Sequence, residues 1–248
     1  MTPTAAILLI GNELLSGRTA DANMNYIARR LTDVGVKLCE VRVVADDEAA
    51  IGEAVNALRD KHTYVFTTGG IGPTHDDITL ASIAKAFGVG MSRNARVEDY
   101  LRKELGNKAV PATFRMADYP EGAEQVWHPK GTDAAWAPCC RMANVFVLAG
   151  VPRVMQAMLE AVLPLLTQGP PIHARSVDVW TRESLIAEGL GDIQARFPAV
   201  DVGSYPYRIE NRPGTTLVAR GTDAAAVAGA HAAILAMLDS MGAELRAA

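Results

Sequence analysis

The chain has 248 residues, of which 49% are apolar and 21% are charged, and its formal net charge is −4. This composition is typical of a globular protein with a sizeable core, and the acidic balance argues against general binding to nucleic acid or anionic membranes. The three cysteines form no CxxC pair, so neither a disulfide framework nor a zinc knuckle is expected. Because the start lacks a cationic leader and no apolar run reaches about 18 residues, we expect a cytoplasmic protein without a membrane span.

Strand-like and helix-like patterns alternate along the first part of the chain. Short runs of apolar and β-branched residues predict three strands, at 5–10, 38–44 and 63–68. Apolar residues at helical spacing predict three helices, which start after Asp21, after Asp46 and near Leu80. Short connections between such elements imply right-handed crossovers. The pattern therefore predicts an α/β domain with a mostly parallel sheet covered by helices on both faces.

The pattern changes twice further along the chain. We expect a helix at 93–105, loops and short hairpins at 111–141, a strand at 144–149 and a helix at 152–166. The run Thr167-Gln168-Gly169-Pro170-Pro171 has the glycine and prolines of a linker. Beyond it, the order strand, helix, strand, strand, helix is predicted at 176–180, 183–196, 201–208, 215–220 and 223–241. Two domains follow from this, one at 1–168 and a small α+β module at 174–248.

The segment 67–77, which reads Thr-Thr-Gly-Gly-Ile-Gly-Pro-Thr-His-Asp-Asp, is the strongest chemical signal. It leads from the carboxyl end of a predicted strand into a helix, where open parallel sheets bind their ligands. Glycines expose backbone N–H groups to phosphate, and a helix N-terminus adds partial positive charge. Two carboxylates beside such an anion cradle, Asp76 and Asp77, make electrostatic sense if a divalent cation binds with the phosphates.

A purely structural interpretation of this segment is also open. Thr74 and Asp77 have the spacing of a capping box, and the glycines can form a tight turn without any ligand. The segment lacks both the Gly-Lys-Ser/Thr of a Walker loop and the GxGxxG of dinucleotide-binding proteins.

Other polar residues follow the predicted strands at the same edge of the sheet. Gly11-Asn12-Glu13 follows the first strand, Asp46 follows the second, and Gly150-Val151-Pro152 follows the strand at 144–149. Because parallel strands share one carboxyl edge, Glu13, Asp46 and Asp77 are expected to converge on one cleft. Taken alone, Asp46 would be an ordinary helix N-cap and Glu13 a solvated turn residue.

These stretches resemble the N-terminal domain of the competence/damage-inducible CinA family, within the molybdopterin-binding, MoaB/Mog-like superfamily. The resemblance covers about residues 4–166 and is carried by 10–17, 21–23, 67–77, 115–117, 120–123, 131–132 and 148–152. It implies a three-layer α/β/α fold. The tail, with Gly203-Ser204-Tyr205-Pro206, looks like the small KH-type βαββα module of that family. Longer members add an amidohydrolase domain that this chain lacks, so no nicotinamide-nucleotide deamidation is expected.

The resemblance implies divalent-metal-dependent hydrolysis of ADP-ribose or an FAD-like dinucleotide at the phosphoanhydride. Mg²⁺ or another divalent cation is expected, with a monovalent cation as an option, and the family suggests a homo-oligomer, a dimer or a trimer. Asp46 and Asp77, with Asp76, would be catalytic, and the first two would hold the metal. The expected ligand-binding residues are Gly11, Asn12, Glu13, Thr68, Gly69, Gly70, Gly72, Pro73, Thr74, Gly150 and Pro152.

Two other functions remain open at this stage. The first is molybdopterin adenylyltransferase activity, which the superfamily also contains and which uses the same loop. The second is a non-catalytic binder whose tail recognises RNA. Residues 174–248 hold seven arginines, no lysine and nine acidic residues, and they lack a GxxG clamp, which argues against nucleic acid. The chain departs from the usual family residues at His128, at 133–135 and at Ala149, in the segment expected to contact the distal half of a ligand, so the substrate stays undecided.

Overall fold

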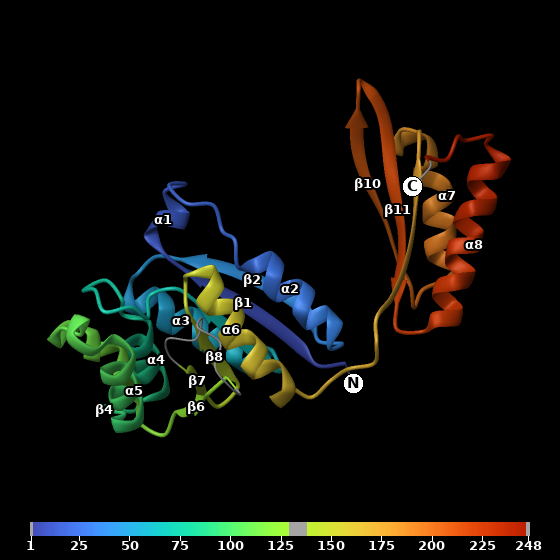
Figure 1. Cartoon of the computed structure of the whole chain (residues 1–248). Helices are drawn as coiled ribbons and strands as arrows, with labels where there is room; N and C mark the ends of the chain where they lie inside the picture. Colours follow the sequence, from blue (N-terminus) through green and yellow to red (C-terminus); the bar gives the residue numbers. More distant parts are fainter. Residues whose placement is uncertain (1, 129–137, 247–248) are drawn as a thin grey trace. The chain divides into compact units, whose positions relative to one another are not determined.

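The computed structural model describes residues 2–128 and 138–246, which fall into two compact units, 1–169 and 170–248 (Figure 1). The resemblance motif at 131–132 and the family departures at 133–135 lie outside the described residues. No helix in the two described ranges has the length and apolar character that crossing a bilayer requires.

A six-stranded sheet with the order β2-β1-β3-β8-β7-β6 forms the centre of the first unit. Its strands are β1 Thr4–Ile10, β2 Lys37–Val44, β3 Tyr64–Thr68, β6 Glu124–Val126, β7 Cys139–Met142 and β8 Val145–Leu148. The four strands β2, β1, β3 and β8 run parallel, and β7 and β6 add an antiparallel edge. A separate antiparallel ribbon pairs β4 Met91–Arg93 with β5 Asp118–Pro120. The mostly parallel sheet predicted from the sequence is confirmed.

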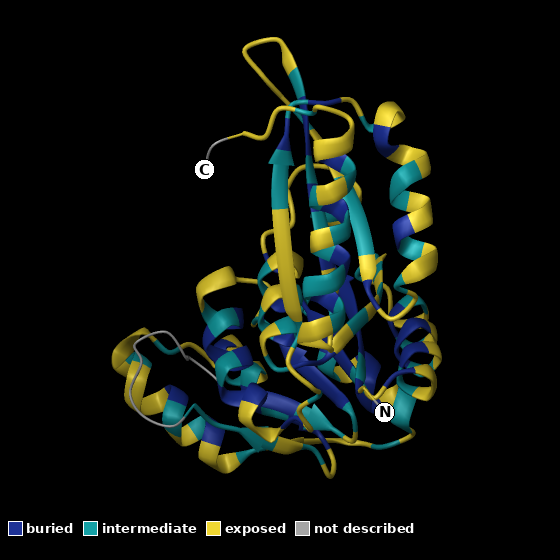
Figure 2. Cartoon of the chain, turned by 90° about the vertical axis from the view of Figure 1, so that its right-hand side faces the viewer, coloured by how far each residue is buried: buried dark blue, intermediate teal, exposed yellow. Residues whose placement is uncertain are grey.

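Helices cover both faces of this sheet. They are α1 Asn12–Leu15, α2 Met24–Asp33, α3 Glu48–Lys61, α4 Thr79–Phe87, α5 Ala95–Leu105 and α6 Pro152–Val162, with 3-10 turns η1 Gly106–Lys108, η2 Pro111–Ala117 and η3 Leu163–Leu165. The helices α2 and α6 contribute to the apolar core on one face, and α3, α4 and α5 contribute to the core on the other. Figure 2 shows the buried strands between helices whose outer sides are exposed. The predicted three-layer α/β/α arrangement is therefore confirmed.

Two helix starts differ from the prediction because other side chains cap them. Asp47 caps α3, since its Oδ1 accepts a hydrogen bond from the Ala50 N–H at 2.9 Å. Asn94 caps α5, so Arg93 lies in β4 and not in the helix. Asp46 is thereby left out of the cap, and its carboxylate is available for another contact.

The second unit is a three-stranded antiparallel sheet covered by two helices. Its elements follow the order β9 His173–Val179, α7 Glu183–Arg196, β10 Asp201–Ile209, β11 Arg212–Gly221 and α8 Ala224–Ser240. The central strand β11 pairs with β10 and β9. Apolar residues of both helices, including Ile193 and Ile234, pack against Leu217 of the sheet. The predicted βαββα order of the small α+β module is confirmed.

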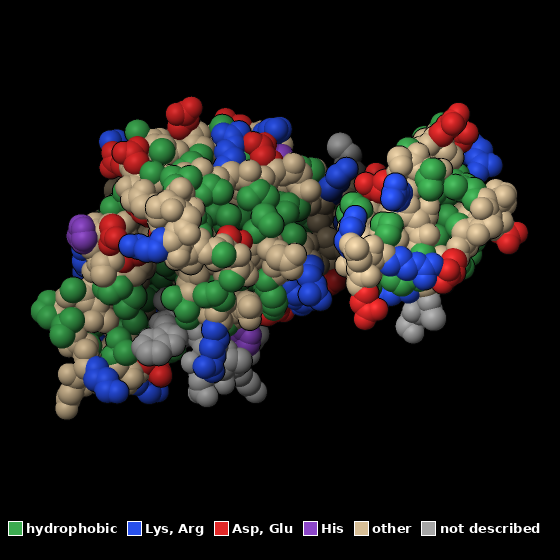
Figure 3. Space-filling model, turned by 90° about the horizontal axis from the view of Figure 1, so that it is seen from above, with side chains coloured by type: hydrophobic (Ala, Val, Ile, Leu, Met, Phe, Trp, Pro, Cys, Tyr) green, Lys and Arg blue, Asp and Glu red, His purple; other side chains and the backbone are tan. Residues whose placement is uncertain are grey.

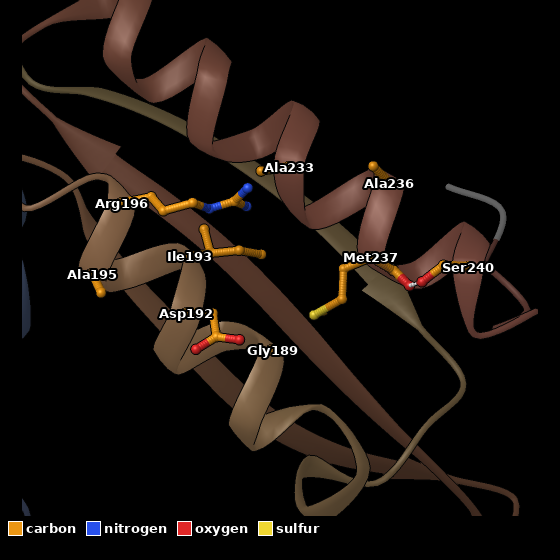
Figure 4. Close-up of a pocket in the computed structure, with 9 residues that line it drawn as sticks. All are labelled: Gly189, Asp192, Ile193, Ala195, Arg196, Ala233, Ala236, Met237 and Ser240. Atoms are coloured by element: carbon orange, nitrogen blue, oxygen red, sulfur yellow. Dashed lines mark hydrogen bonds between the residues drawn. The ribbon is translucent and has the colours of Figure 1, made fainter.

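An open groove lies between α7 and α8 (Figure 4). Its lining consists largely of small residues, and a Cβ on Gly189 would lie 2.4 Å from the sulfur of Met237. Asp192 and Arg196 supply the charge along the groove. Gly189 thus lets α7 approach Met237 of α8 closely.

Candidate functional site

Backbone hydrogen bonds join the ends of the parallel strands at one edge of the sheet. The N–H of Gly11 donates to the carbonyl of Val44 at 3.1 Å, which holds the turn after β1 beside the end of β2. The N–H of Gly69 donates to the carbonyl of Leu148 at 3.3 Å, which holds the glycine loop beside the end of β8. The polar segments that follow these strands therefore share one edge.

Gly69 and Gly70 are fixed by contacts that only glycine allows. Both have positive φ, +104° and +64°. A Cβ on Gly69 would lie 2.1 Å from the Ile10 carbonyl oxygen, and a Cβ on Gly70 would lie 2.4 Å from the Thr79 hydroxyl oxygen. Thr79, buried in the first turn of α4, donates its hydroxyl to the Gly69 carbonyl at 2.9 Å and its N–H to the Gly70 carbonyl at 3.0 Å.

The carbonyls of the two glycines are thus turned towards α4, and the N–H groups that follow are left unused. The backbone N–H groups of Gly70, Ile71 and Gly72 donate to no described residue. Three successive backbone N–H groups of this glycine loop are therefore available to an anion.

Asp46 lies beside this loop on the β2 side. Its Oδ2 accepts a hydrogen bond from the Asn12 N–H at 2.8 Å. Its Oδ1 would lie 3.7 Å from a Cβ on Gly70 and accepts no hydrogen bond from a described residue. The carboxylate is therefore held through one oxygen and has the other available beside the loop.

Asp77, at the far end of the loop, also accepts hydrogen bonds through only one of its two carboxylate oxygens. Its Oδ2 accepts hydrogen bonds from the Thr74 N–H at 2.8 Å and from the Thr74 hydroxyl. Its Oδ1 would lie 3.1 Å from a Cβ on Gly72 and receives no hydrogen bond within the described part of the chain. The pair forms a local turn and not the cap of α4, which starts at Thr79 after Ile78 without a side-chain cap.

The tip of the turn is exposed. Pro73, Thr74 and His75 are all exposed, and the His75 Nδ1 lies 3.9 Å from the Asp76 Oδ1. A hydrogen bond with the Thr74 side chain, followed by one from its own backbone N–H, lowers the pKa of Asp76 below its usual value. Asp76 does not line the cavity described next.

A cavity of about 360 Å³ opens beside the loop. Its lining comes from the loop with Asp77, from α4, and from the β4–β5 ribbon with the preceding η2 turn: Gly70, Ile71, Gly72, Asp77, Leu80, Ala81, Met91, Ser92, Arg93, Arg115 and Asp118. Arg93 forms ion pairs with Asp118 and Glu98, and hydrogen bonds from Arg102 and Arg93 lower the pKa of Glu98. Arg115 is exposed and pairs with no described residue, so it is the cation that a ligand can engage.

The other predicted site residues, Asp46 among them, do not line the cavity. Thr68 is buried at the end of β3, the Glu13 carboxylate lies against Gly11, and Pro152 begins α6. A Cβ on Gly150 would lie 3.3 Å from the Gly69 Cα, and its carbonyl accepts a hydrogen bond from the Asn23 side-chain amide at 2.8 Å. The structure brings these residues to one edge of the sheet.

Acidic residues at this edge do not form a closed metal centre. Within residues 2–128 and 138–246, no three His, Cys, Asp or Glu side chains form a group that could hold a metal ion. Asp46 and Asp77 each offer one carboxylate oxygen beside the N–H groups. That donor set suits Mg²⁺, which is commonly bound by one or two carboxylates together with phosphate oxygens and water.

The space-filling view shows acidic and basic side chains interspersed on the surface of both units (Figure 3). No broad basic field is visible on the face that it presents, in keeping with the net charge of −4. On this face, an anion at the loop would be attracted by the local N–H groups and by Arg115 and not by a broad basic surface.

Three residues at this edge had no role predicted from the sequence: Arg115, Thr79 and Asn23. In the sequence, Arg115 contributes only to the family resemblance, because no pattern in the neighbouring residues predicts that its turn lies beside the glycine loop. Thr79 and Asn23 bond to glycine carbonyls distant in sequence. Only the helix N-terminus at 79 was indicated by the sequence pattern.

The mostly parallel sheet, with the glycine loop at its carboxyl edge, defines an α/β protein with a candidate anion-binding loop. Residues 6–168 match the family described as "Probable molybdopterin binding domain", and residues 171–244 match "FAD synthase, middle domain". The chain belongs to the CinA-like proteins of this molybdopterin-binding domain family.

Similar proteins match this chain over different shares of its length. A CinA-like protein of Syntrophus aciditrophicus is 36% identical over 210 residues, which are 81% of this chain and 50% of that protein. The chain thus spans about half the length of that relative. A protein of Archaeoglobus fulgidus is 34% identical over 212 residues, 86% of this chain and 87% of its own. The crystal structure of the protein CinA from Thermoplasma acidophilum, a protein of unknown function, matches with a TM-score of 0.58 and 31% identity, and the match covers 65% of this chain and 96% of that one.

Proposed function

We propose that the first unit binds a nucleotide pyrophosphate, ADP-ribose or an FAD-like dinucleotide, and hydrolyses its phosphoanhydride bond. The observation that carries this proposal is the run of three unused N–H groups at Gly70, Ile71 and Gly72 between the carboxylates of Asp46 and Asp77. A pyrophosphate needs both an anion cradle and a counter-charge for its second phosphate. Arg115 supplies that counter-charge in the same cavity.

Each group then has a task in the reaction. The three N–H groups bind oxygens of one phosphate, and Arg115 binds the other. Asp46 and Asp77 would hold Mg²⁺, which lowers the charge on the phosphate oxygens when bound. The available Asp77 oxygen can also orient the attacking water. Water adds to one phosphorus and the bridging P–O bond breaks, so ADP-ribose yields AMP and ribose 5-phosphate, and FAD yields AMP and FMN.

The family match of the second unit favours a dinucleotide as the substrate. Residues 171–244 match a domain named for an FAD synthase, which handles a flavin and an adenine nucleotide. The name of the first domain's family favours a pterin instead, so molybdopterin adenylylation is the second candidate. The same cradle would then hold the phosphate of the pterin or of ATP.

The test is chromatography of products from Mg–ADP-ribose and Mg–FAD, with Mg–ATP plus molybdopterin in parallel. We expect AMP from the dinucleotides, and kcat at least about 100-fold lower in Asp46→Ala and Asp77→Ala with circular dichroism unchanged.

Asp47→Ala is the matched control because it removes the neighbouring carboxylate. It should lower the free energy of unfolding by about 1 kcal/mol through the lost α3 cap and leave kcat near wild type. Normal turnover in Asp77→Ala would contradict the assignment. Adenylylated molybdopterin, without dinucleotide cleavage, would select the second candidate.

A further inference from the structure

The sheet of the second unit extends beyond the start of helix α7. The Ser204 hydroxyl of β10 donates to the Glu183 Oε1 in the first turn of α7, at 2.6 Å. Near the other end of the helix, the Gln194 Oε1 accepts a hydrogen bond from the Val202 N–H at 2.9 Å. The helix therefore runs opposite to β10, and the part of this strand after Ser204 lies beyond the start of α7.

A cavity of about 390 Å³ lies at this end of the sheet. Three segments line it: 181–183, where the chain enters α7, 206–208 of β10, and 213–215 of β11. Because all three belong to the second unit, the cavity is separate from the glycine loop. Its volume falls within the usual range of small-molecule sites.

The walls of this cavity are held in place. The Thr215 hydroxyl donates to the Thr181 carbonyl at 3.0 Å, and both residues are buried. This bond fixes the connection before α7 against the central strand β11. Pro206 and Pro213 lie on the other two segments, and their rings restrict the backbone there. A preformed cavity loses little conformational entropy when a ligand binds.

Two arginines of the lining, Arg182 and Arg208, form no ion pair with any residue that the structure describes. Arg208 donates to the neutral side chain of Asn211 at 2.8 Å. Acidic residues are not scarce, since residues 174–248 hold nine of them and seven arginines. Elsewhere in this unit an arginine does pair with an acid, as Arg212 does with Glu244. The cavity therefore carries positive charge that the fold does not neutralise.

The acidic residue of the lining is Glu183. One of its oxygens accepts a hydrogen bond from Ser204, which does not line the cavity. The lining thus combines two positive charges with one negative charge, and the rings of Pro206 and Pro213 add carbon surface. Guanidinium groups bind phosphate oxygens through parallel N–H donors.

We propose that this cavity binds a phosphate monoester with a small organic group, such as a nucleoside monophosphate. Arg182 and Arg208 bind the phosphate from two segments of the lining, and Pro206 and Pro213 contact the organic group. A phosphate monoester carries a charge of about −1.5 to −2 at pH 7, which is more than a carboxylate or a phosphodiester carries. A monoester therefore matches two arginines beside one carboxylate best.

The first experiment follows the backbone amide signals of the full chain by heteronuclear NMR while AMP is added without Mg²⁺. We expect the signals of 181–183, 207–208 and 214–215 to shift and to saturate at millimolar AMP. The amides of 70–72 report the glycine loop in the same titration, so a failure of the proposed hydrolase site and a failure of this site are told apart. Unshifted signals in the second unit, or equal shifts with acetate, would contradict the proposal.

The second experiment repeats the titration with variants. Arg182→Gln and Arg208→Gln should each weaken AMP binding at this cavity at least about tenfold, because each removes a charge-assisted hydrogen bond. The matched control Arg196→Gln removes an exposed arginine from the last turn of the same helix and should bind AMP as the wild type does. Glu183→Gln removes the negative charge and keeps an oxygen for Ser204, so AMP should bind about threefold more tightly. Wild-type affinity in Arg182→Gln, or weaker binding in Glu183→Gln, would overturn the proposal.

Discussion

The two halves of the glycine loop are built in opposite ways. Gly69 is buried and Gly70 half-buried, and both are bonded to Thr79 of α4 and crowded against backbone or a buried side chain. The segment from Pro73 to Asp76 is exposed, and its described contacts lie within the turn that ends at Asp77. The first half therefore holds the backbone that carries the N–H groups, whereas the second half places a carboxylate. Substitutions in the two halves should therefore separate stability from activity.

The largest effect is expected at Gly69. In Gly69→Ala the Cβ would meet the Ile10 carbonyl, backbone that cannot move aside, in addition to the strain of a positive φ. The free energy of unfolding should fall by at least about 3 kcal/mol. Urea denaturation followed by circular dichroism measures it. Gly88→Ala is the control, since it has a φ of +69° and open space around its Cβ, and it should cost about 1 kcal/mol. Equal losses at both positions would show that the contact with Ile10 is unimportant.

A smaller effect is expected at the hydroxyl that holds the loop. Thr79→Val removes the bond to the Gly69 carbonyl within a fully buried site and should cost about 1–3 kcal/mol. Because the N–H groups then lose their orientation, affinity for the dinucleotide should fall as well, as titration calorimetry can measure. Ser82→Ala serves as the comparison, because its hydroxyl bonds only within the start of α4, to the Ile78 carbonyl. Unchanged affinity in Thr79→Val would show that the Thr79 hydroxyl does not contribute to ligand binding.

The smallest change in stability is expected in the exposed half. Thr74→Ala removes the hydroxyl that bonds to the neighbouring carboxylates within an exposed turn, so the free energy of unfolding should move by no more than about 0.5 kcal/mol. Turnover should nevertheless fall several-fold, since Asp77 loses part of its anchor. His75→Ala, at a side chain 96% exposed beside it, should leave both unchanged. Thermal unfolding and the product assay in parallel test this, and a stability loss as large as that of Thr79→Val would remove the distinction between the halves.

The spacing of residues in the sequence was sufficient to predict most helices and strands and the position of the glycine loop. The alternation of strand and helix patterns, the βαββα order of the tail and the carboxyl-edge position of 67–77 follow from spacing between near neighbours. The family resemblance rests on the same short motifs. The short helix at 12–15 and the antiparallel strands at 124–126 and 139–142 were not predicted in detail, because segments this short have little periodicity of their own.

Tertiary packing decided which of several similar residues take part. Asp46 and Asp47 are adjacent and chemically alike, yet Asp47 caps α3 and Asp46 binds the turn after β1. Asp76 and Asp77 are equally alike, yet only Asp77 lines the cavity, which Arg115 enters from a distant turn. Sequence spacing describes neighbours along the chain, whereas the direction of a carboxylate depends on groups that folding brings from other strands. For that reason the position of the loop could be predicted from the sequence, whereas the charged groups that surround it became known only from the tertiary structure.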